Sequence, residues 1–212
     1  MKNIDAKVKK WFAEIRPFYY NRESFSFDPR KSALLIIDMQ RYFAQKSGRA
    51  YLPAADAIIP RIRALLDAFR RRGLPIIFTR HGHKGQADLG IMGKFWGDFI
   101  KFGESDWEII DDLKPRVNEA IVDKTRYDAF FRTQLDSILQ SLGVSQLVIT
   151  GVMTHLCCET TARSAFARDY EVYLAADATA SNREEFHVGT LRALANGFGI
   201  VVKSFKILES LK

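Results

Sequence analysis

Six short apolar segments alternate with segments of helical periodicity along most of this chain. The apolar runs cover residues 33–38, 74–80, 119–124, 146–151, 171–177 and 199–203. The helical patterns cover residues 60–73, 133–143, 155–169 and 183–197. Continuous apolar strands joined by helices are typical of a parallel sheet with both faces buried. The pattern therefore predicts a three-layer α/β/α fold with a six-stranded, mainly parallel sheet.

The helical segment 60–73 carries start and stop signals. Pro60 suits the first turn of a helix, where a backbone N–H has no intrahelical partner. The run RRRG at 70–73 puts arginines at the negative end of the helix and a glycine at its stop. No stripe of aromatic and basic residues accompanies this run, so we interpret it as a helix end and expect no nucleic-acid binding.

The chain has 212 residues, which is enough for one domain with a large core. Residues 1–30 are expected to form an N-terminal extension, an amphipathic helix and an aromatic arm, that packs on the domain or on a partner subunit. Residues 31–212 are expected to form the domain itself. The segment 81–118 is rich in glycine and too long for a simple connection, so we expect a lid or pocket wall there.

The composition restricts where the protein is expected to be located and what it is expected to bind. No stretch approaches the roughly 18 apolar residues of a membrane span, and the charged N-terminal segment does not resemble a secretory signal. The two cysteines are adjacent and make a poor disulfide framework, so a cytoplasmic location is expected. The net charge of +7 favours an anionic small-molecule substrate.

Reactive side chains follow the ends of several predicted strands: Asp38, His81, Lys124 and Cys157. Taken singly, an aspartate, a lysine or a cysteine at such a place is more often a cap, a solvated charge or a core residue. Ligands of open parallel sheets bind beyond the carboxyl ends of the strands. Two interpretations therefore remain. The three residues have separate structural roles, or Asp, Lys and Cys together form a nucleophilic site at one edge of the sheet.

Cys157 and Cys158 are the only cysteines, and helical spacing separates their roles. Cys158 shares a stripe that should face the sheet, together with Ala162, Ala165 and Phe166. Cys157 is turned about 100° away from that stripe. With Thr154 as N-cap, Cys157 falls in the first helical turn, where free N–H groups favour a thiolate. We therefore expect Cys157 to be the reactive thiol.

Three blocks of the sequence together resemble one enzyme family. They read LLIIDMQRYF at 34–43, VDKTRYDAFFRTQL at 122–135 and VITGVMTHLCCETTARSAFARDYEVYLAADATAS at 148–181. In this order the chain is similar to the isochorismatase-like cysteine hydrolases from about residue 31 to 208. That family includes nicotinamidases, N-carbamoylsarcosine amidases, ureidoacrylate and biuret hydrolases, and isochorismatases. The resemblance implies an isochorismatase-like, Rossmann-like α/β/α fold.

The resemblance also implies the site residues. By motif position the catalytic triad falls on Asp38, Lys124 and Cys157. A non-proline cis peptide is implied at Val152–Met153, with the backbone N–H groups of Met153 and Cys157 forming an oxyanion hole. Asp38 would accept the thiol proton, Lys124 would stabilise the thiolate, and a thioester would form on Cys157. This chemistry needs no metal and no cofactor.

The substrate class stays open at this point. The motif GKFWGDFI resembles isochorismatases, which release pyruvate from an enol ether and usually carry a small residue at the position of Cys157. Three positions that are Gln, Arg and Tyr in those enzymes hold His81, Leu89 and Met153. This favours hydrolysis of an amide, ureido or carbamoyl C–N bond. Isochorismatase activity is the alternative, and a non-catalytic binding member of the family is the second alternative.

Nicotinamidases bind a divalent metal through an Asp-x-His motif and a further histidine. The matching tripeptide is HGH at 81–83, so the full motif is missing and we expect no metal, with a site that includes His81 and His83 as the alternative. The expected pocket lining comprises His81 as hydrogen-bond donor and the aromatic residues Phe43, Trp96, Tyr127 and Phe131. 

Two further expectations concern residues outside the pocket. Asp177 matches a family aspartate, and we expect it to bond nearby backbone N–H groups. The aromatic arm and the helical face near 160–166 predict a homodimer or a higher homo-oligomer.

Overall fold

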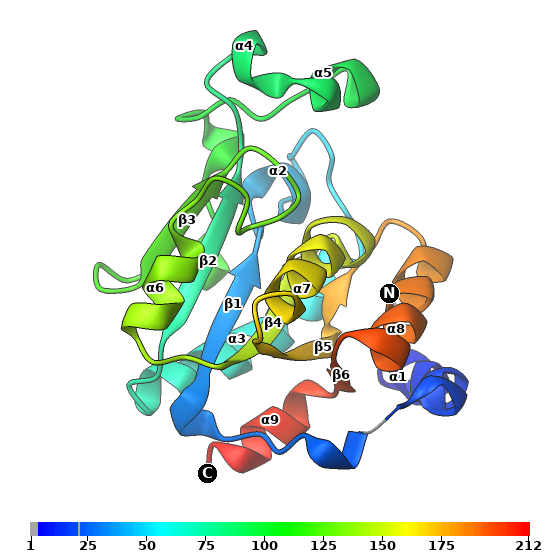
Figure 1. Ribbon diagram of the computed structural model, residues 1–212. Coiled ribbons are helices and arrows are strands. Elements are labelled where there is room, and N and C mark those ends of the chain that lie inside the picture. The colour runs from blue at the N-terminus through cyan, green and yellow to red at the C-terminus, as the bar shows by residue number, and fades with distance from the viewer. Residues whose placement is uncertain (1–3, 21) are drawn as a thin grey trace.

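The computed structural model describes residues 4–20 and 22–212 and contains a six-stranded sheet in which all paired strands are parallel (Figure 1). The strand order is β3-β2-β1-β4-β5-β6. The strands are β1 Ser32–Ile37, β2 Ile76–His81, β3 Ala120–Lys124, β4 Gln146–Val152, β5 Glu171–Ala180 and β6 Ile200–Val202. This confirms the predicted α/β/α class. The order reverses between β1 and β4, and such a switch point opens a crevice at the carboxyl ends of the two strands.

Helices cover both faces of the sheet (Figure 1). Helices α3 (Ala55–Arg71) and α9 (Ser204–Ser210) contact each other on one face, and α6 (Leu135–Ser141), α7 (Glu159–Phe166) and α8 (Glu184–Gly197) lie on the other. Every residue of β1 and β4 is buried, because helices exclude water from both of their sides. This explains why these strands read as continuous apolar runs.

Short elements complete the chain. Beyond the carboxyl ends of the strands lie α2 (Arg41–Ala44), α4 (Gln86–Leu89) and α5 (Ile91–Trp96). Single 3₁₀ turns occur at Arg16–Phe18, Arg22–Ser24, Pro29–Lys31, Ser105–Trp107 and Asp111–Leu113. A π-helical turn, Thr154–Cys158, links β4 to α7.

Helix α3 begins at Ala55, so the expectation that Pro60 lies in the first turn is wrong. Ala55, Ile58 and Ile62 are buried at helical spacing, which extends the apolar stripe upstream of the proline. Pro60 lacks the N–H that would reach the Asp56 carbonyl, and both residues are exposed, so water can satisfy that carbonyl. The stop is confirmed, since Gly73 has a φ of 63° just after the helix.

The N-terminal segment packs against the domain through helix α1 (Ile4–Ile15). The Trp11 side chain is buried and donates its indole N–H to Glu184 at 2.9 Å, and Lys7 forms an ion pair with the same carboxylate. Farther along, the Phe27 ring lies 5.2 Å from the ring of Tyr173. A role of this segment against a partner subunit stays a prediction. None of the helices that the structure describes is long and apolar enough to cross a membrane.

Gly151 in β4 is a position where the fold admits no side chain. Its φ is +104°, and a Cβ there would lie 2.0 Å from the carbonyl oxygen of Ile37 on the neighbouring strand. We expect Gly151→Ala to lower the free energy of unfolding by about 3 kcal/mol or more, through strain and overlap at the switch point. Chemical denaturation of the purified variant measures this loss.

The matched control is Gly189→Ala in α8, where an added Cβ meets no atom within 4 Å. Alanine is the better helix former, so this change should stabilise the protein by about 0.4–1 kcal/mol. A Gly151→Ala variant as stable as wild type would contradict the close approach of β1 and β4.

Candidate active site

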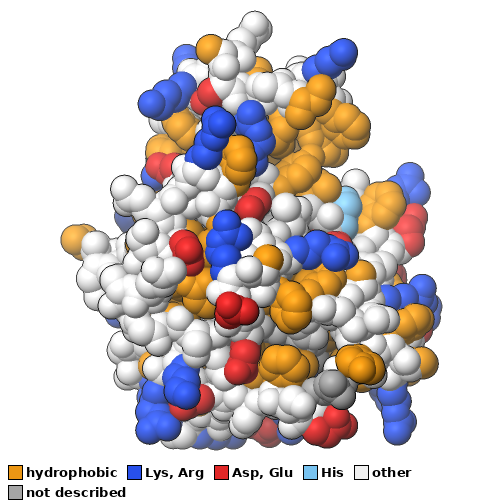
Figure 2. Space-filling model, viewed as in Figure 1, with side chains coloured by type: hydrophobic (Ala, Val, Ile, Leu, Met, Phe, Trp, Pro, Cys, Tyr) orange, Lys and Arg blue, Asp and Glu red, His pale blue; other side chains and the backbone are white. Residues whose placement is uncertain are grey.

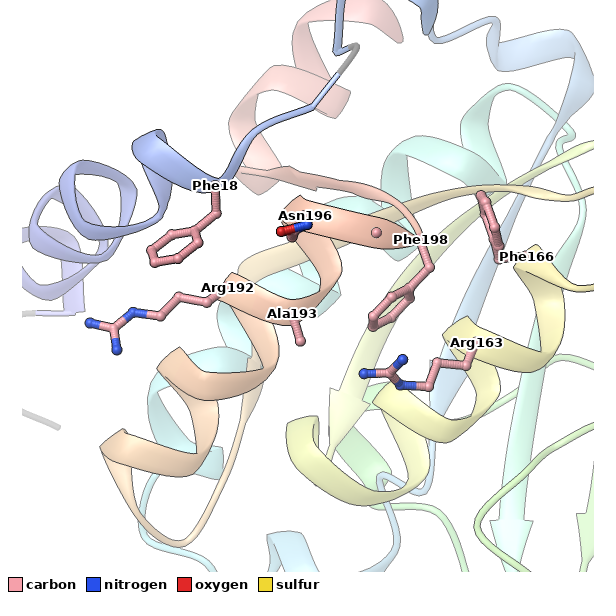
Figure 3. A pocket seen from close by; sticks show the side chains of 8 residues that line it. Phe18, Arg163, Phe166, Arg192, Ala193, Asn196 and Phe198 are labelled. Atoms are coloured by element: carbon pink, nitrogen blue, oxygen red, sulfur yellow. The ribbon is translucent and has the colours of Figure 1, made fainter.

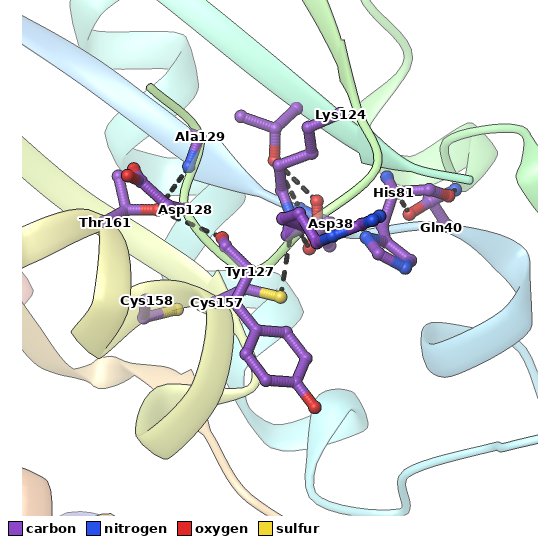
Figure 4. A network of polar contacts seen from close by, with 12 residues as sticks. Asp38, Gln40, His81, Lys124, Tyr127, Asp128, Ala129, Cys157, Cys158 and Thr161 are labelled. Atoms are coloured by element: carbon purple, nitrogen blue, oxygen red, sulfur yellow. Dashed lines mark hydrogen bonds and ion pairs between the residues drawn. The ribbon is translucent and has the colours of Figure 1, made fainter. Parts of the chain in front are cut away.

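Three polar side chains from separate strands meet at the switch point of the sheet (Figure 4). Asp38 follows β1, Lys124 ends β3, and Cys157 lies in the π-helical turn after β4. The Lys124 ammonium nitrogen lies 2.7 Å from Asp38 Oδ2, and it donates to Cys157 Sγ at 3.3 Å and to the Arg126 carbonyl at 3.1 Å. All three side chains of this cluster are buried. The arrangement can generate and hold a sulfur nucleophile.

The resting cluster holds a neutral thiol beside an ion pair. Burial raises the pKa of the Cys157 thiol, the Asp38 carboxylate raises it further, and Lys124 lowers it without reversing the shift. Burial and Asp38 together outweigh the lowering of this pKa by Lys124. Burial lowers the pKa of Lys124, but Asp38 and Cys157 produce a net rise, so the ammonium stays charged. Deprotonation of the thiol must then accompany substrate binding or attack.

The two cysteines have different surroundings. Cys157 lines a cavity and contacts Lys124, whereas Cys158 is fully buried with its sulfur 4.0 Å from the Thr150 carbonyl (Figure 4). This agrees with the helical spacing of the sequence. The prediction that Phe166 belongs to the buried stripe is wrong, because Phe166 lies in the last turn of α7 and is 47% exposed.

Thr154 does not cap the helix that carries Cys157. Its hydroxyl is bonded to the His187 Nδ1 at 2.9 Å, and Met153 occupies the N-cap position. The wider π turn is closed by the Cys158 N–H, which donates to the Met153 carbonyl at 3.2 Å. Turns of this kind are frequent at functional sites. The peptide bond between Val152 and Met153 is cis.

A cavity of about 160 Å³ opens above the Cys157 sulfur. Four predicted pocket residues line it, namely Phe43, His81, Trp96 and Tyr127. Sequence reasoning missed further lining residues, several of them from the glycine-rich segment that was expected to form a wall: Tyr42, Ala50, His83, Leu89, Met92, Asp98, Phe99, Ile100 and Leu156. Trp96 and Tyr127 are joined within this lining, where the Trp96 indole N–H donates to the Tyr127 hydroxyl at 2.7 Å.

Phe131 is not a pocket residue. Its side chain is 41% exposed and lies under the Arg132 guanidinium, 5.1 Å from the ring centre. The adjacent Phe130 takes the buried position in this turn. Neighbouring residues of a turn point in different directions, so only one of the two aromatic rings faces inward.

The rim above the cavity is apolar. Helix α5 exposes Ile91, Phe95 and Trp96, with exposed fractions of 71%, 75% and 50%. In the space-filling view hydrophobic side chains gather at the upper right of the molecule, over α5 (Figure 2). Trp96 belongs both to this surface and to the lining of the cavity.

His81 is held neutral in the pocket wall. Burial, with the charge of Lys124, lowers the pKa of His81 to about 3. Its backbone is fixed by Gln40, which donates to the His81 carbonyl at 2.9 Å and accepts from the His81 N–H at 2.8 Å. Among the residues that the structure describes, no three His, Cys, Asp or Glu side chains gather in a group that could hold a metal ion. A neutral imidazole is suited to hydrogen bonding with substrate.

A larger hollow of about 510 Å³ lies between α7 and α8 and contains none of these reactive residues (Figure 3). Arg163 and Arg192 at this hollow are paired with Glu159 and Glu14, at 2.8 and 2.7 Å. Phe18 of the N-terminal arm and Phe166 of α7 both line this hollow. These are the two surfaces on which the homo-oligomer was predicted, and that assembly stays a prediction.

Asp177 takes the structural role expected from the sequence. Its two carboxylate oxygens accept from the backbone N–H and the hydroxyl of Ser204, both at 2.7 Å. These bonds tie the start of α9 to β5, away from the cavity.

Acid should destabilise the fold through buried neutral histidines. Burial lowers the pKa of His187 to about 4 from its usual 6.5, so the unfolded chain binds a proton at a pH where the folded protein does not. The contribution of neutral His187 to the free energy of unfolding is therefore complete above about pH 6.5 and is lost as the pH falls toward 4. By pH 5 the free energy of unfolding should have fallen by on the order of 2 kcal/mol. Denaturant unfolding at pH 7 and pH 5 measures this loss. The same drop in His187→Gln as in wild type would show that His187 is not its source.

Comparison with known proteins places this site in a family. The isochorismatase domain model matches residues 32–204. The chain is 40% identical over 183 residues to nicotinamidase 3 of Arabidopsis thaliana, covering 85% of this chain and 88% of that protein. It is 33% identical over 191 residues to enterobactin synthase component B of Escherichia coli K12, covering 90% of this chain and 67% of that protein.

A solved structure shows the same fold. A cysteine hydrolase from Pseudomonas syringae pv. phaseolicola 1448A superposes with a TM-score of 0.84 at 28% identity, covering 88% of this chain and 95% of that one. The fold, the matched domain model and the named relatives agree, and the chain belongs to the isochorismatase family of hydrolases.

Proposed function

We propose that this protein is a cysteine hydrolase that cleaves the C–N bond of a small amide, ureido or carbamoyl compound through a thioester on Cys157. The observation that carries the proposal is the position of the Cys157 sulfur, which faces a cavity while Lys124 lies directly behind it. The relative with 40% identity is named a nicotinamidase, and nicotinamidases act on an amide bond. 

The reaction follows from the groups around the sulfur. Asp38 accepts the thiol proton as the sulfur attacks the substrate carbonyl carbon, and the carbonyl π electrons move to oxygen. The N–H groups of Met153 and Cys157 stabilise that oxyanion. When the C–N bond breaks, the proton on Asp38 passes to the leaving nitrogen, so amine and thioester form. Asp38 then takes a proton from water, the hydroxide displaces the sulfur, and that proton returns to the thiolate.

The cavity favours an uncharged substrate over the anionic one suggested by net charge. None of its lining residues in the described part of the chain is a lysine or an arginine, and Lys124 is sealed behind the sulfur. The lining is mostly aromatic and aliphatic, and its histidines have pKa values lowered by burial. A cavity of about 160 Å³ is close to the roughly 150 Å³ that holds one benzene ring. Isochorismate, with two carboxylates, would lack a counter-charge there.

A substrate panel tests the proposal. Nicotinamide, benzamide and biuret represent uncharged substrates, N-carbamoylsarcosine an anionic one, and isochorismate the enol ether. We expect the protein to release ammonia from an uncharged amide. The Cys157→Ala variant, used as the negative control, should release none. Pyruvate release from isochorismate without ammonia release from any amide would establish the alternative activity. No product from the panel would favour a binding role.

A further inference from the structure

Asp38 is held in an unusual backbone conformation. It lies directly after β1 with a φ of 50°, in the left-handed region that residues other than glycine seldom adopt. Its side chain is completely buried, where an unpartnered carboxylate oxygen is costly. Both its backbone and its carboxylate therefore need partners from the surrounding strands.

Thr79 on the adjacent strand β2 meets both needs with one hydroxyl group. The Asp38 N–H donates to Thr79 Oγ1 at 3.2 Å, and the same hydroxyl donates its proton to Asp38 Oδ1 at 2.6 Å. Thr79 is also completely buried. The hydroxyl acts as acceptor and donor to a single residue, so it fixes the backbone and the carboxylate of Asp38 relative to each other.

The two carboxylate oxygens thereby have different roles. Oδ1 accepts a hydrogen bond from the Thr79 hydroxyl. Oδ2 lies 2.7 Å from the Lys124 nitrogen, which in turn contacts the Cys157 sulfur. We propose that Thr79 is a positioning residue that turns Oδ2 of Asp38 toward the thiol, so that this oxygen receives the Cys157 proton. The inference rests on the proposed thiol chemistry, and it adds a fourth side chain to the triad.

A second buried threonine provides a matched control. Thr150 lies on the central strand β4, is completely buried, and donates its hydroxyl to the Leu35 carbonyl at 3.1 Å. Both substitutions remove a buried hydroxyl from a strand inside the sheet, which costs the hydrogen bond to Leu35 at Thr150 and the two bonds to Asp38 at Thr79. Only Thr79 has a bond to a reactive group, so the two substitutions separate a structural effect from an effect on proton transfer.

The experiment compares Thr79→Val, Thr79→Ser and Thr150→Val with the amide of the panel that turns over fastest. A hydrogen bond to a charged group contributes about 1.5–3 kcal/mol, so Thr79→Val should lower kcat by about 10- to 100-fold. KM should stay within about twofold, since Thr79 does not line the cavity. Thr79→Ser keeps the hydroxyl and should return kcat to within about threefold of wild type, and Thr150→Val should keep nearly full kcat.

Other outcomes would overturn the inference. They are a Thr79→Val variant with wild-type kcat, a Thr79→Ser variant as slow as Thr79→Val, or an equal kcat loss in Thr150→Val. If Thr79→Val does not fold, Thr79→Ala replaces it and is read in the same way. Cys157→Ala, measured in parallel, separates the two proposals. Retained turnover there refutes the thiol mechanism and this inference with it, whereas lost turnover with a fully active Thr79→Val refutes only the role of Thr79.

Discussion

Replacing Cys157 with alanine is expected to lower kcat by roughly 10⁴-fold or more, because the covalent route has no other nucleophile in the cluster. The fold should tolerate the change, since only one sulfur atom leaves a site that already borders a cavity. Steady-state ammonia release with the best panel amide measures the loss. Circular dichroism and the denaturation midpoint establish that the variant is folded.

Cys158→Ser is the control for this prediction. Cys158 is fully buried on the sheet side of the turn, and a serine hydroxyl there can donate to the nearby Thr150 carbonyl. We expect it to keep most of the activity. Equal losses in the two variants, with both still folded, would contradict the assignment of Cys157 as the nucleophile.

Lys124→Met is expected to lower both stability and activity. It leaves the Asp38 carboxylate buried without its ion-pair partner, which should cost about 3–5 kcal/mol of unfolding free energy. It also removes the group that lowers the pKa of the Cys157 thiol, so the thiolate becomes rarer. Alkylation of Cys157 by iodoacetamide at neutral pH should therefore slow, and turnover should fall below detection.

A double variant separates these two effects of Lys124. Asp38→Asn combined with Lys124→Met removes both charges, so most of the lost stability should return, to within about 2 kcal/mol of wild type. Activity should not return, because neither proton acceptor nor cation remains. A Lys124→Met variant with wild-type stability and an unchanged alkylation rate would show that Lys124 does not lie beside the thiol.

Sequence periodicity was sufficient for the sheet, and it placed the residues of the reactive cluster on one edge. Apolar runs that end in Asp38 and Lys124 place those side chains on one edge, because parallel strands share the direction of their carboxyl ends. Helical spacing separated Cys157 from Cys158 for the same kind of reason. Strand ends and helical spacing depend on regular geometry, which sequence periodicity reports well, whereas the choice of these three residues as a triad came from the resemblance to the family.

Other features depend on geometry that periodicity does not report. The π turn takes Thr154 out of the capping position and gives its hydroxyl to His187. Which of the rings of Phe130 and Phe131 faces inward depends on the geometry of one turn. The pKa of Cys157 depends on how completely the cluster is buried. Thr79 lies within an apolar strand, where a threonine is ordinary, so only the contact with Asp38 reveals it.

The proposed thioester on Cys157 is tested most directly by partitioning with hydroxylamine. Two substrates with the same acyl group and different leaving groups, a primary amide and the methyl ester, are hydrolysed in the presence of the same hydroxylamine concentration. A common acyl-enzyme must yield the same ratio of hydroxamate to carboxylic acid from both substrates, and this is the result we predict. A ratio that changes with the leaving group would mean that water attacks the substrate directly, and it would contradict a covalent role for Cys157.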